Sequence, residues 1–106
     1  MLKFSIIIPT YREKSLPRTL NSIADLDYPI EKFECLVCDN SNSDKITQIV
    51  RNYSEKYPFI KYVQANEKNG VYFARNVGVK KSKGEILCFL DDDDLLPEKV
   101  DTLKSW

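Results

Sequence analysis

The stretch that organises the chain is Ile86-Leu87-Cys88-Phe89-Leu90-Asp91-Asp92-Asp93-Asp94, in which five apolar residues lead directly into four carboxylates. A short apolar run that ends in a polar break is typical of a strand buried on both faces. Four adjacent acids repel one another, since two unit charges about 5 Å apart repel by roughly 3 kcal/mol at an effective dielectric of about 20. A divalent cation such as Mg²⁺ or Mn²⁺ offsets this repulsion and prefers carboxylate oxygens. The stretch therefore predicts either a metal site that holds an anionic substrate or a solvated acidic turn.

Along the rest of the chain, apolar runs alternate with segments of helical periodicity. Strands are predicted at residues 3–8, where Pro9 ends the strand, and at 33–38, 60–65 and 86–90. Helices are predicted to begin near the suitable N-caps Ser15 and Ser43, to include residues 74–81, and to run from 97 to 106. Strands that alternate with helices predict an α/β fold, namely a Rossmann-like, mostly parallel sheet of about four strands with helices on both faces.

Polar residues follow each predicted strand. They are the groups 9–12, 39–41, 66–67 and 91–94. In an open parallel sheet, ligands bind beyond the carboxyl ends of the strands, so these groups predict a ligand site at that edge. Because side chains two apart in an extended segment point the same way, Asp91 and Asp93 are expected on one side of the chain and Asp92 and Asp94 on the other.

Composition narrows the functional class and the compartment. The 106 residues suffice for one small domain, and 16 basic residues balance 16 acidic ones, so no nucleic-acid partner is expected. No apolar run approaches the roughly 18 residues of a membrane span, and the N-terminus lacks a secretory pattern. Three cysteines indicate a reducing compartment. The expected location is cytoplasmic, either free or at the cytoplasmic face of a membrane in the full-length protein.

Cys35 and Cys38 have the spacing of a redox or zinc pair, but they lie in a predicted strand. An odd separation in a strand places the two thiols on opposite faces, which argues against a shared metal or disulfide. The chain has no histidine, so catalysis by this segment does not use imidazole.

The turn after the first strand does not fit a dinucleotide-binding fold. None of the three glycines lies there, and the turn instead holds Pro9, Thr10, Tyr11 and Arg12. Tyr11 can stack on a base, or it can be a half-exposed loop tyrosine.

Two further residues have a binding role and a plainer alternative. Asp39 can accept a hydrogen bond from a base or a ribose, or it can form an Asx turn. Arg75, in the first turns of the third helix, can pair with a phosphate, or it can be a surface arginine. Gly70 can release the chain into that helix, and Gly78 can let the helix approach the sheet closely.

Several segments together carry a resemblance to a known family. In order they are Ser5-Ile6-Ile7-Ile8-Pro9-Thr10-Tyr11, Leu16 with Leu20-Asn21-Ser22-Ile23, Tyr28-Pro29, Asp39-Asn40-Ser41, Ala74-Arg75-Asn76-Val77-Gly78, and Gly84-Glu85 followed by Phe89-Leu90-Asp91-Asp92-Asp93-Asp94. The series resembles the nucleotide-sugar-binding N-terminal half of a family 2 glycosyltransferase of the GT-A fold, and it covers nearly the whole chain. Arg12, Cys38 and Asn40 depart from the common pattern, which has Asn, a second acid and Gly at these places.

The resemblance implies an enzyme that transfers a sugar from a nucleotide-diphosphate donor, a UDP-sugar, to an acceptor hydroxyl with inversion. The implied acceptors are a sugar, a lipid-linked or a protein acceptor in polysaccharide or glycoconjugate biosynthesis. It implies a DXD motif at Asp91-x-Asp93, where Asp93 and Asp91 bind Mn²⁺ or Mg²⁺. The implied nucleotide-binding residues are Pro9, Thr10, Tyr11, Asp39, Arg75, Asp91 and Asp92.

The resemblance also implies that residues 1–106 are the donor-binding part of a longer, C-terminally truncated domain. It implies no catalytic residue in this chain, because the base is expected beyond Trp106, so the isolated chain is expected to be inactive. The last predicted helix, with Val100, Leu103 and Trp106, is expected to leave an apolar face that supports self-association.

Two other functions fit parts of the sequence. A non-catalytic module that binds nucleotide or only assembles with a partner would also leave the last helix without a cover. A haloacid-dehalogenase-like phosphatase would use Asp91 as nucleophile and Asp93 as acid. That pattern normally continues with Gly-Thr on an early strand, whereas Asp94-Leu95-Leu96 follows here on the fourth.

Overall fold

The computed structural model describes residues 2–92. Along the chain the elements are β1 (Phe4–Thr10), α1 (Leu16–Ala24), the 3₁₀ turn η1 (Ile30–Lys32), β2 (Phe33–Asp39), α2 (Lys45–Lys56), β3 (Ile60–Gln64), α3 (Val71–Lys81) and β4 (Ile86–Phe89). Asp93, Asp94 and the predicted helix at 97–106, with its proposed self-association, lie outside the described residues.

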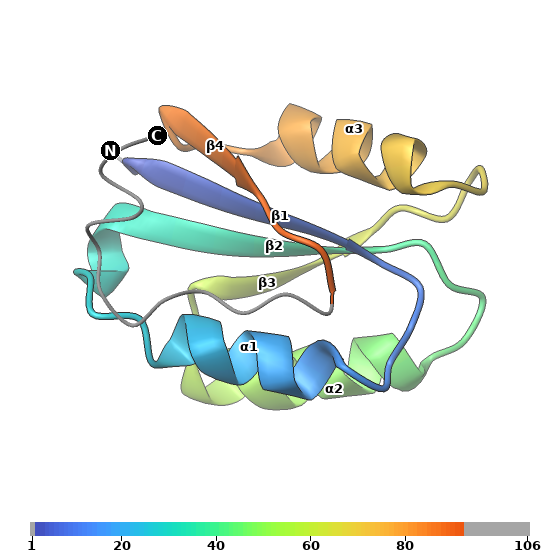
Figure 1. Ribbon diagram of the computed structural model, residues 1–106, viewed down its shortest axis with the longest axis horizontal. Helices are drawn as coiled ribbons and strands as arrows, with labels where there is room; N and C mark the ends of the chain where they lie inside the picture. Colours follow the sequence, from blue (N-terminus) through green and yellow to red (C-terminus); the bar gives the residue numbers. More distant parts are fainter. Residues whose placement is uncertain (1, 93–106) are drawn as a thin grey trace.

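The four strands form one parallel sheet in the order β3-β2-β1-β4. Figure 1 shows α1 and α2 on one face of the sheet and α3 on the other. This arrangement confirms the predicted α/β fold with helices on both faces. All four strands end toward the same edge, so the described polar residues that follow them are gathered there.

Two apolar clusters fill the space between the sheet and its helices. The larger cluster includes Ile6, Ile8, Leu20, Val37 and Val50 and lies under α1 and α2. The smaller cluster lies under α3 and contains Ile7, Leu36, Cys38, Val63, Ala65 and Ala74. Alternate residues of β1 and β2 thus serve different faces, as the period of a strand requires.

Cys35 and Cys38 belong to these two separate clusters, which confirms that their thiols lie on opposite faces of β2. Gly78 confirms the expected close approach of α3. A Cβ atom at Gly78 would lie 2.7 Å from both Cys38 Sγ and Ile7 Cγ2. Helix α3 therefore packs on the sheet at a distance that a larger residue at position 78 would prevent.

The prediction that Pro9 ends the first strand is wrong, because β1 continues to Thr10. Backbone groups of successive strand residues face opposite neighbours. The Ile7 carbonyl accepts the Leu90 amide on the β4 side, and the Thr10 carbonyl accepts an amide on the β2 side. Pro9 therefore faces the β4 side, where pairing ends at Ile7. Its missing N–H removes no ladder bond, so the strand tolerates it.

A buried acid lies near the amino end of the sheet. Glu34 is 2% exposed, and its carboxylate accepts bonds from the Ser5 hydroxyl at 2.7 Å and the Lys83 amide at 2.7 Å. Lys61 Nζ lies 3.1 Å from the other carboxylate oxygen. Burial alone would raise the pKa of Glu34, but these three donors together hold it below its ordinary value.

Across residues 2–92, the helices are too short and too polar to include a membrane-spanning segment.

Candidate functional site

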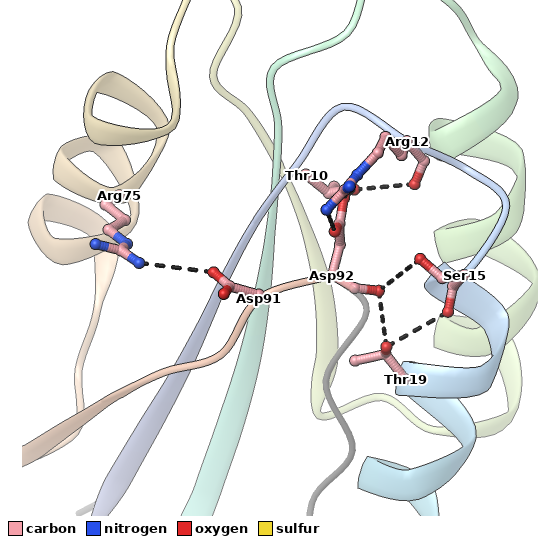
Figure 2. Close-up of polar contacts among 7 residues, drawn as sticks. All are labelled: Thr10, Arg12, Ser15, Thr19, Arg75, Asp91 and Asp92. Atoms are coloured by element: carbon pink, nitrogen blue, oxygen red, sulfur yellow. Dashed lines mark hydrogen bonds and ion pairs between the residues drawn. The ribbon is translucent and has the colours of Figure 1, made fainter.

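The carboxyl edge of the sheet brings together the end of β1, the end of β2, the start of α3 and the acids that follow β4. Figure 2 shows the polar contacts around the first two of those acids. Asp91 and Asp92 point in different directions, Asp91 toward α3 and Asp92 toward the β1–α1 connection. This agrees with the alternation expected for the acidic run, as far as its described members go.

Asp92 is almost completely buried, with 2% of its side chain exposed. Its carboxylate forms an ion pair with Arg12 through Nη2 and Nε, and it accepts the Thr10 hydroxyl at 2.9 Å. Its backbone carbonyl accepts the hydroxyls of Ser15 at 3.1 Å and Thr19 at 2.8 Å. Both the side chain and the backbone of Asp92 are therefore held by residues from β1, α1 and the connection between them.

The Ser15 hydroxyl was expected to cap α1. Ser15 does occupy the N-cap position, but its side chain makes no capping bond. Its hydroxyl is instead directed to the Asp92 carbonyl. The difference arises because a tertiary acceptor lies within reach, which a local sequence pattern does not reveal.

Asp91 is the exposed member of the pair, with 57% of its side chain accessible. Its Oδ1 lies 3.7 Å from Arg75 Nη2. The Arg75 guanidinium lies over the rings of Tyr72 and Phe89, at 5.8 Å and 5.5 Å from their centroids. Its Nε is buried and has no hydrogen-bond partner among residues 2–92. A cation is thus held between two aromatic rings beside the first acid of the run.

Asp39 is buried at the end of β2 and forms the Asx turn that was its alternative role. Its Oδ1 accepts the Ser41 amide at 2.8 Å and the Ser41 hydroxyl at 2.6 Å, and its Oδ2 accepts the Tyr62 hydroxyl at 2.7 Å. Asp39 and Tyr62 line a polar cavity of 440 Å³ beside the start of α2. A bond to a nucleoside would have to replace or add to these contacts.

Tyr11 is 60% exposed and lines a different cavity, of 280 Å³, together with Asn40, Asn69, Gly70 and Val71. This cavity lies at the start of α3. The structure therefore does not place Tyr11 and Asp39 in one cavity. Of the other predicted nucleotide-binding residues, Pro9 and Thr10 are buried within β1. The binding roles of all these residues stay predictions.

Two residues that matter at this edge had no role assigned from the sequence. Arg12 pairs with Asp92, and the Asn40 side chain bridges β2 to the loop before α3. Both belong to the polar groups that predict the ligand site, and both depart from the family pattern, but the sequence identified no partner for either. Their partners lie 80 and 25 to 30 residues away along the chain, so no local signal identifies them.

The family model for glycosyl transferase family 2 matches residues 5–103 of this sequence. The chain belongs to glycosyl transferase family 2. Over 90 residues this family 2 chain is 40% identical to glycosyltransferase AglE of Haloferax volcanii, an alignment that covers 84% of the chain and 30% of AglE. Over 106 residues it is 38% identical to the poly(ribitol-phosphate) beta-N-acetylglucosaminyltransferase TarS of Staphylococcus aureus, covering 99% of the chain and 18% of TarS.

Solved structures agree with this assignment. The structure of S. aureus TarS 1-349 in complex with UDP matches with a TM-score of 0.84 and 39% identity, over 98% of this chain and 30% of that one. The UDP-GlcNAc complex matches with a TM-score of 0.76 and 34% identity, over the same shares. The mannosyltransferase PcManGT from Pyrobaculum calidifontis, in complex with GDP-Man and Mn²⁺, matches with a TM-score of 0.81 and 31% identity, over 90% and 28%.

These matches show that the fold is the nucleotide-binding half of the GT-A fold. The family 2 chain spans less than a third of AglE and of TarS. Within residues 2–92, no three acidic, cysteine or histidine side chains are grouped so that they could hold a metal ion. Asp93 and Asp94, the other two acids of the run, lie outside the described residues.

Proposed function

We propose that the protein transfers a sugar from a nucleotide-diphosphate donor, a UDP-sugar, to an acceptor hydroxyl with inversion and with the help of a divalent metal. The observation that carries the proposal is the Arg75–Asp91 pair at the carboxyl edge of the sheet, in a chain similar to TarS, whose structures contain UDP and UDP-GlcNAc. The phosphatase alternative has no support in these matches.

The described residues would form the donor side of the site. Val71 lines the Tyr11 cavity, and Arg75 lies four residues further along α3, hence on the same face of that helix. A base stacked on Tyr11 and a diphosphate paired with Arg75 would lie along that face. The planar guanidinium suits a phosphate, because it can donate two parallel hydrogen bonds.

Of the two described acids that follow β4, only Asp91 is accessible to a hard divalent cation. Asp91 offers an accessible carboxylate, whereas the Asp92 carboxylate is buried against Arg12 and Thr10. Asp91 and Asp93 are therefore the residues that would hold Mn²⁺ or Mg²⁺. When bound, the cation would neutralise the charge of the leaving diphosphate. Arg75 would add a second positive charge on the same side.

The acceptor side is proposed to lie beyond this chain. A carboxylate after Trp106 would take the proton from the acceptor hydroxyl, as general-base catalysis requires. The acceptor would be a sugar, a lipid-linked glycan or a protein in polysaccharide or glycoconjugate biosynthesis. We place the protein in the cytoplasm or at the cytoplasmic face of a membrane, which its three buried, unpaired cysteines support.

Calorimetric titration of the chain with UDP, with and without Mn²⁺, tests the donor site. We expect binding that requires Mn²⁺ and that Asp91→Ala or Asp93→Ala weakens strongly. Asp27→Ala, which removes an exposed acid far from this edge, is the matched control. Absence of heat with UDP and with GDP in Mn²⁺ would contradict the proposal. Release of UDP from UDP-GlcNAc by the full-length protein separates an enzyme from a module that only binds.

A further inference from the structure

Arg12 has no role in the donor site as proposed above, although its guanidinium lies 5.2 Å from the centroid of the Tyr11 ring. It is the cation that pairs with Asp92 in the acidic turn formed by Asp91 and Asp92. Its Nη2 contacts Asp92 Oδ1, and its Nε lies 3.4 Å from Asp92 Oδ2. The Arg12 guanidinium thus donates to both oxygens of the Asp92 carboxylate. Such a fork fixes the plane of the carboxylate as well as its distance, which a single ammonium does not do.

The remaining contacts of Asp92 come from the same region of the chain. Thr10, at the end of β1, donates to the carboxylate, and Ser15 and Thr19, at the start of α1, donate to the backbone carbonyl. With its carboxylate and its carbonyl both held, Asp92 has little freedom to rotate. The side chain of Asp91, the residue before it, projects to a different side and meets Arg75 there.

Because the Asp92 carboxylate is buried, its contact with Arg12 stabilises it more than the hydrogen bonds from the hydroxyls do. A carboxylate that is 2% exposed is strongly unfavourable unless a positive charge and hydrogen bonds compensate it. The hydroxyls of Thr10, Ser15 and Thr19 supply hydrogen bonds but no charge. Arg12 supplies the charge, and it does so from outside the face that Asp91 and Arg75 share.

We propose that Arg12, acting through Asp92, is a positioning residue for the acidic turn and holds it so that Asp91 faces Arg75 and the donor. The ligand named in this inference rests on the proposed function. The anchoring of the turn does not, since it is a property of the chain without any ligand. Asp92 is on this account an anchor, and Asp91 is the member of the pair that meets the metal nucleotide.

The test compares Arg12→Ala with Arg12→Lys, with Arg18→Ala as control. Arg18 is an exposed arginine of α1 that lines the same surface cavity as Arg12 and has no contact with Asp92 among the described residues. The first readout is the ¹⁵N heteronuclear NOE of the Asp91 and Asp92 amides without ligand. The second is the affinity for UDP in saturating Mn²⁺. The third is the midpoint of urea unfolding.

In Arg12→Ala we expect lower NOE values at residues 91 and 92, with Leu90 unchanged because its amide remains bonded to the Ile7 carbonyl. We expect UDP affinity to fall about ten-fold, the effect of losing one charge-assisted contact at the low end of its usual range. Arg12→Lys should recover part of both effects. Arg18→Ala should match the parent protein.

A second variant separates the effect of Arg12 on the position of the acidic turn from its effect on the stability of the protein. Arg12→Ala leaves the buried Asp92 charge without its cation, so this variant is expected to be less stable. Arg12→Ala/Asp92→Asn removes that charge, and its unfolding midpoint should recover while its UDP affinity stays low. Recovery of affinity together with stability would overturn the positioning role, as would unchanged NOE values in Arg12→Ala. If the parent protein bound no UDP, the proposed function would fail, and the NOE comparison would still decide whether Arg12 anchors the turn.

Discussion

The Asn40 side chain at the end of the second strand accepts the Gly70 amide at 3.0 Å, and this bond fixes the start of α3. The same side chain donates to the carbonyls of Ala65 at 2.7 Å and Lys68 at 2.8 Å. Gly70 has a φ of 123°, a region that favours glycine, so the chain turns sharply into the helix there. One amide side chain therefore sets the position of the helix that carries Arg75.

Asn40→Ala should lower the free energy of unfolding by about 1–3 kcal/mol, because it leaves polar groups of the loop without their partners. It should also weaken UDP binding, since the loop borders the Tyr11 cavity. Urea unfolding and calorimetry measure the two effects. Asn42→Ala is the control, because Asn42 is exposed. Equal stability of Asn40→Ala and the parent would show that water replaces all three contacts.

Glu34→Gln should lower the free energy of unfolding at neutral pH and make it vary less with pH in the acid range. The pKa of Glu34 in the folded protein lies below its ordinary value of 4.5. The carboxylate therefore contributes stability that is fully present above the unfolded pKa and is lost as the pH falls through the folded pKa. We expect the difference between parent and Glu34→Gln to be largest near pH 7 and to shrink progressively below about pH 4.5.

Urea unfolding at a series of pH values measures this difference. Glu31→Gln, which changes an exposed acid nearby, should show no such convergence with the parent. A Glu34→Gln curve that runs parallel to the parent curve from pH 7 to pH 3 would mean that Glu34 is not the group responsible.

The three cysteines should resist thiol reagents in the folded protein. Burial raises the pKa of Cys38 to about 12 and that of Cys88 to about 11, and it raises the pKa of Cys35 further. Because the thiolate is the reactive form, all three should label slowly with Ellman's reagent at pH 8 and rapidly after unfolding in urea. Labelling of any one of them in the native protein at the rate of free cysteine would contradict its burial.

Local patterns were sufficient to predict the sheet and the three α-helices within residues 2–92. Apolar runs such as 33–38 predict buried strands, and the odd spacing of Cys35 and Cys38 correctly placed the thiols on opposite faces. The end of β1 was missed, because whether a strand tolerates Pro9 depends on where its neighbour β4 stops pairing. That information is not local to the residue.

The site was predictable in location but not in detail. The order of strands and helices implied that Asp91 and Asp92 lie at the carboxyl edge of the sheet. The sequence did not show that Arg12 pairs with Asp92, 80 residues away, or that Asp39 is engaged by Tyr62. Which polar groups form contacts depends on how loops from different strands pack. For the same reason, the adjacent acids Asp91 and Asp92 differ in burial.

Arg75 combines a packing role with a proposed binding role, and the two predict effects of different size. Its contacts with the rings of Tyr72 and Phe89 each contribute about 0.5–1 kcal/mol at an exposed site. A charge-assisted contact with a phosphate contributes about 1.5–3 kcal/mol, which corresponds to roughly ten- to hundred-fold in affinity. The two roles can therefore be separated by comparing stability with binding.

Arg75→Ala should lower UDP affinity in Mn²⁺ by about ten- to hundred-fold and lower the free energy of unfolding by no more than about 2 kcal/mol. Arg75→Lys should retain part of the affinity, because it keeps the charge but loses the fork. Calorimetry and urea unfolding measure both quantities, and Lys80→Ala, at an exposed position of the same helix, is the control. If Arg75→Ala bound UDP as tightly as the parent while losing stability, Arg75 would serve only the packing of α3 against β4 and Asp91. The phosphate would then have to pair with a different cation at this edge.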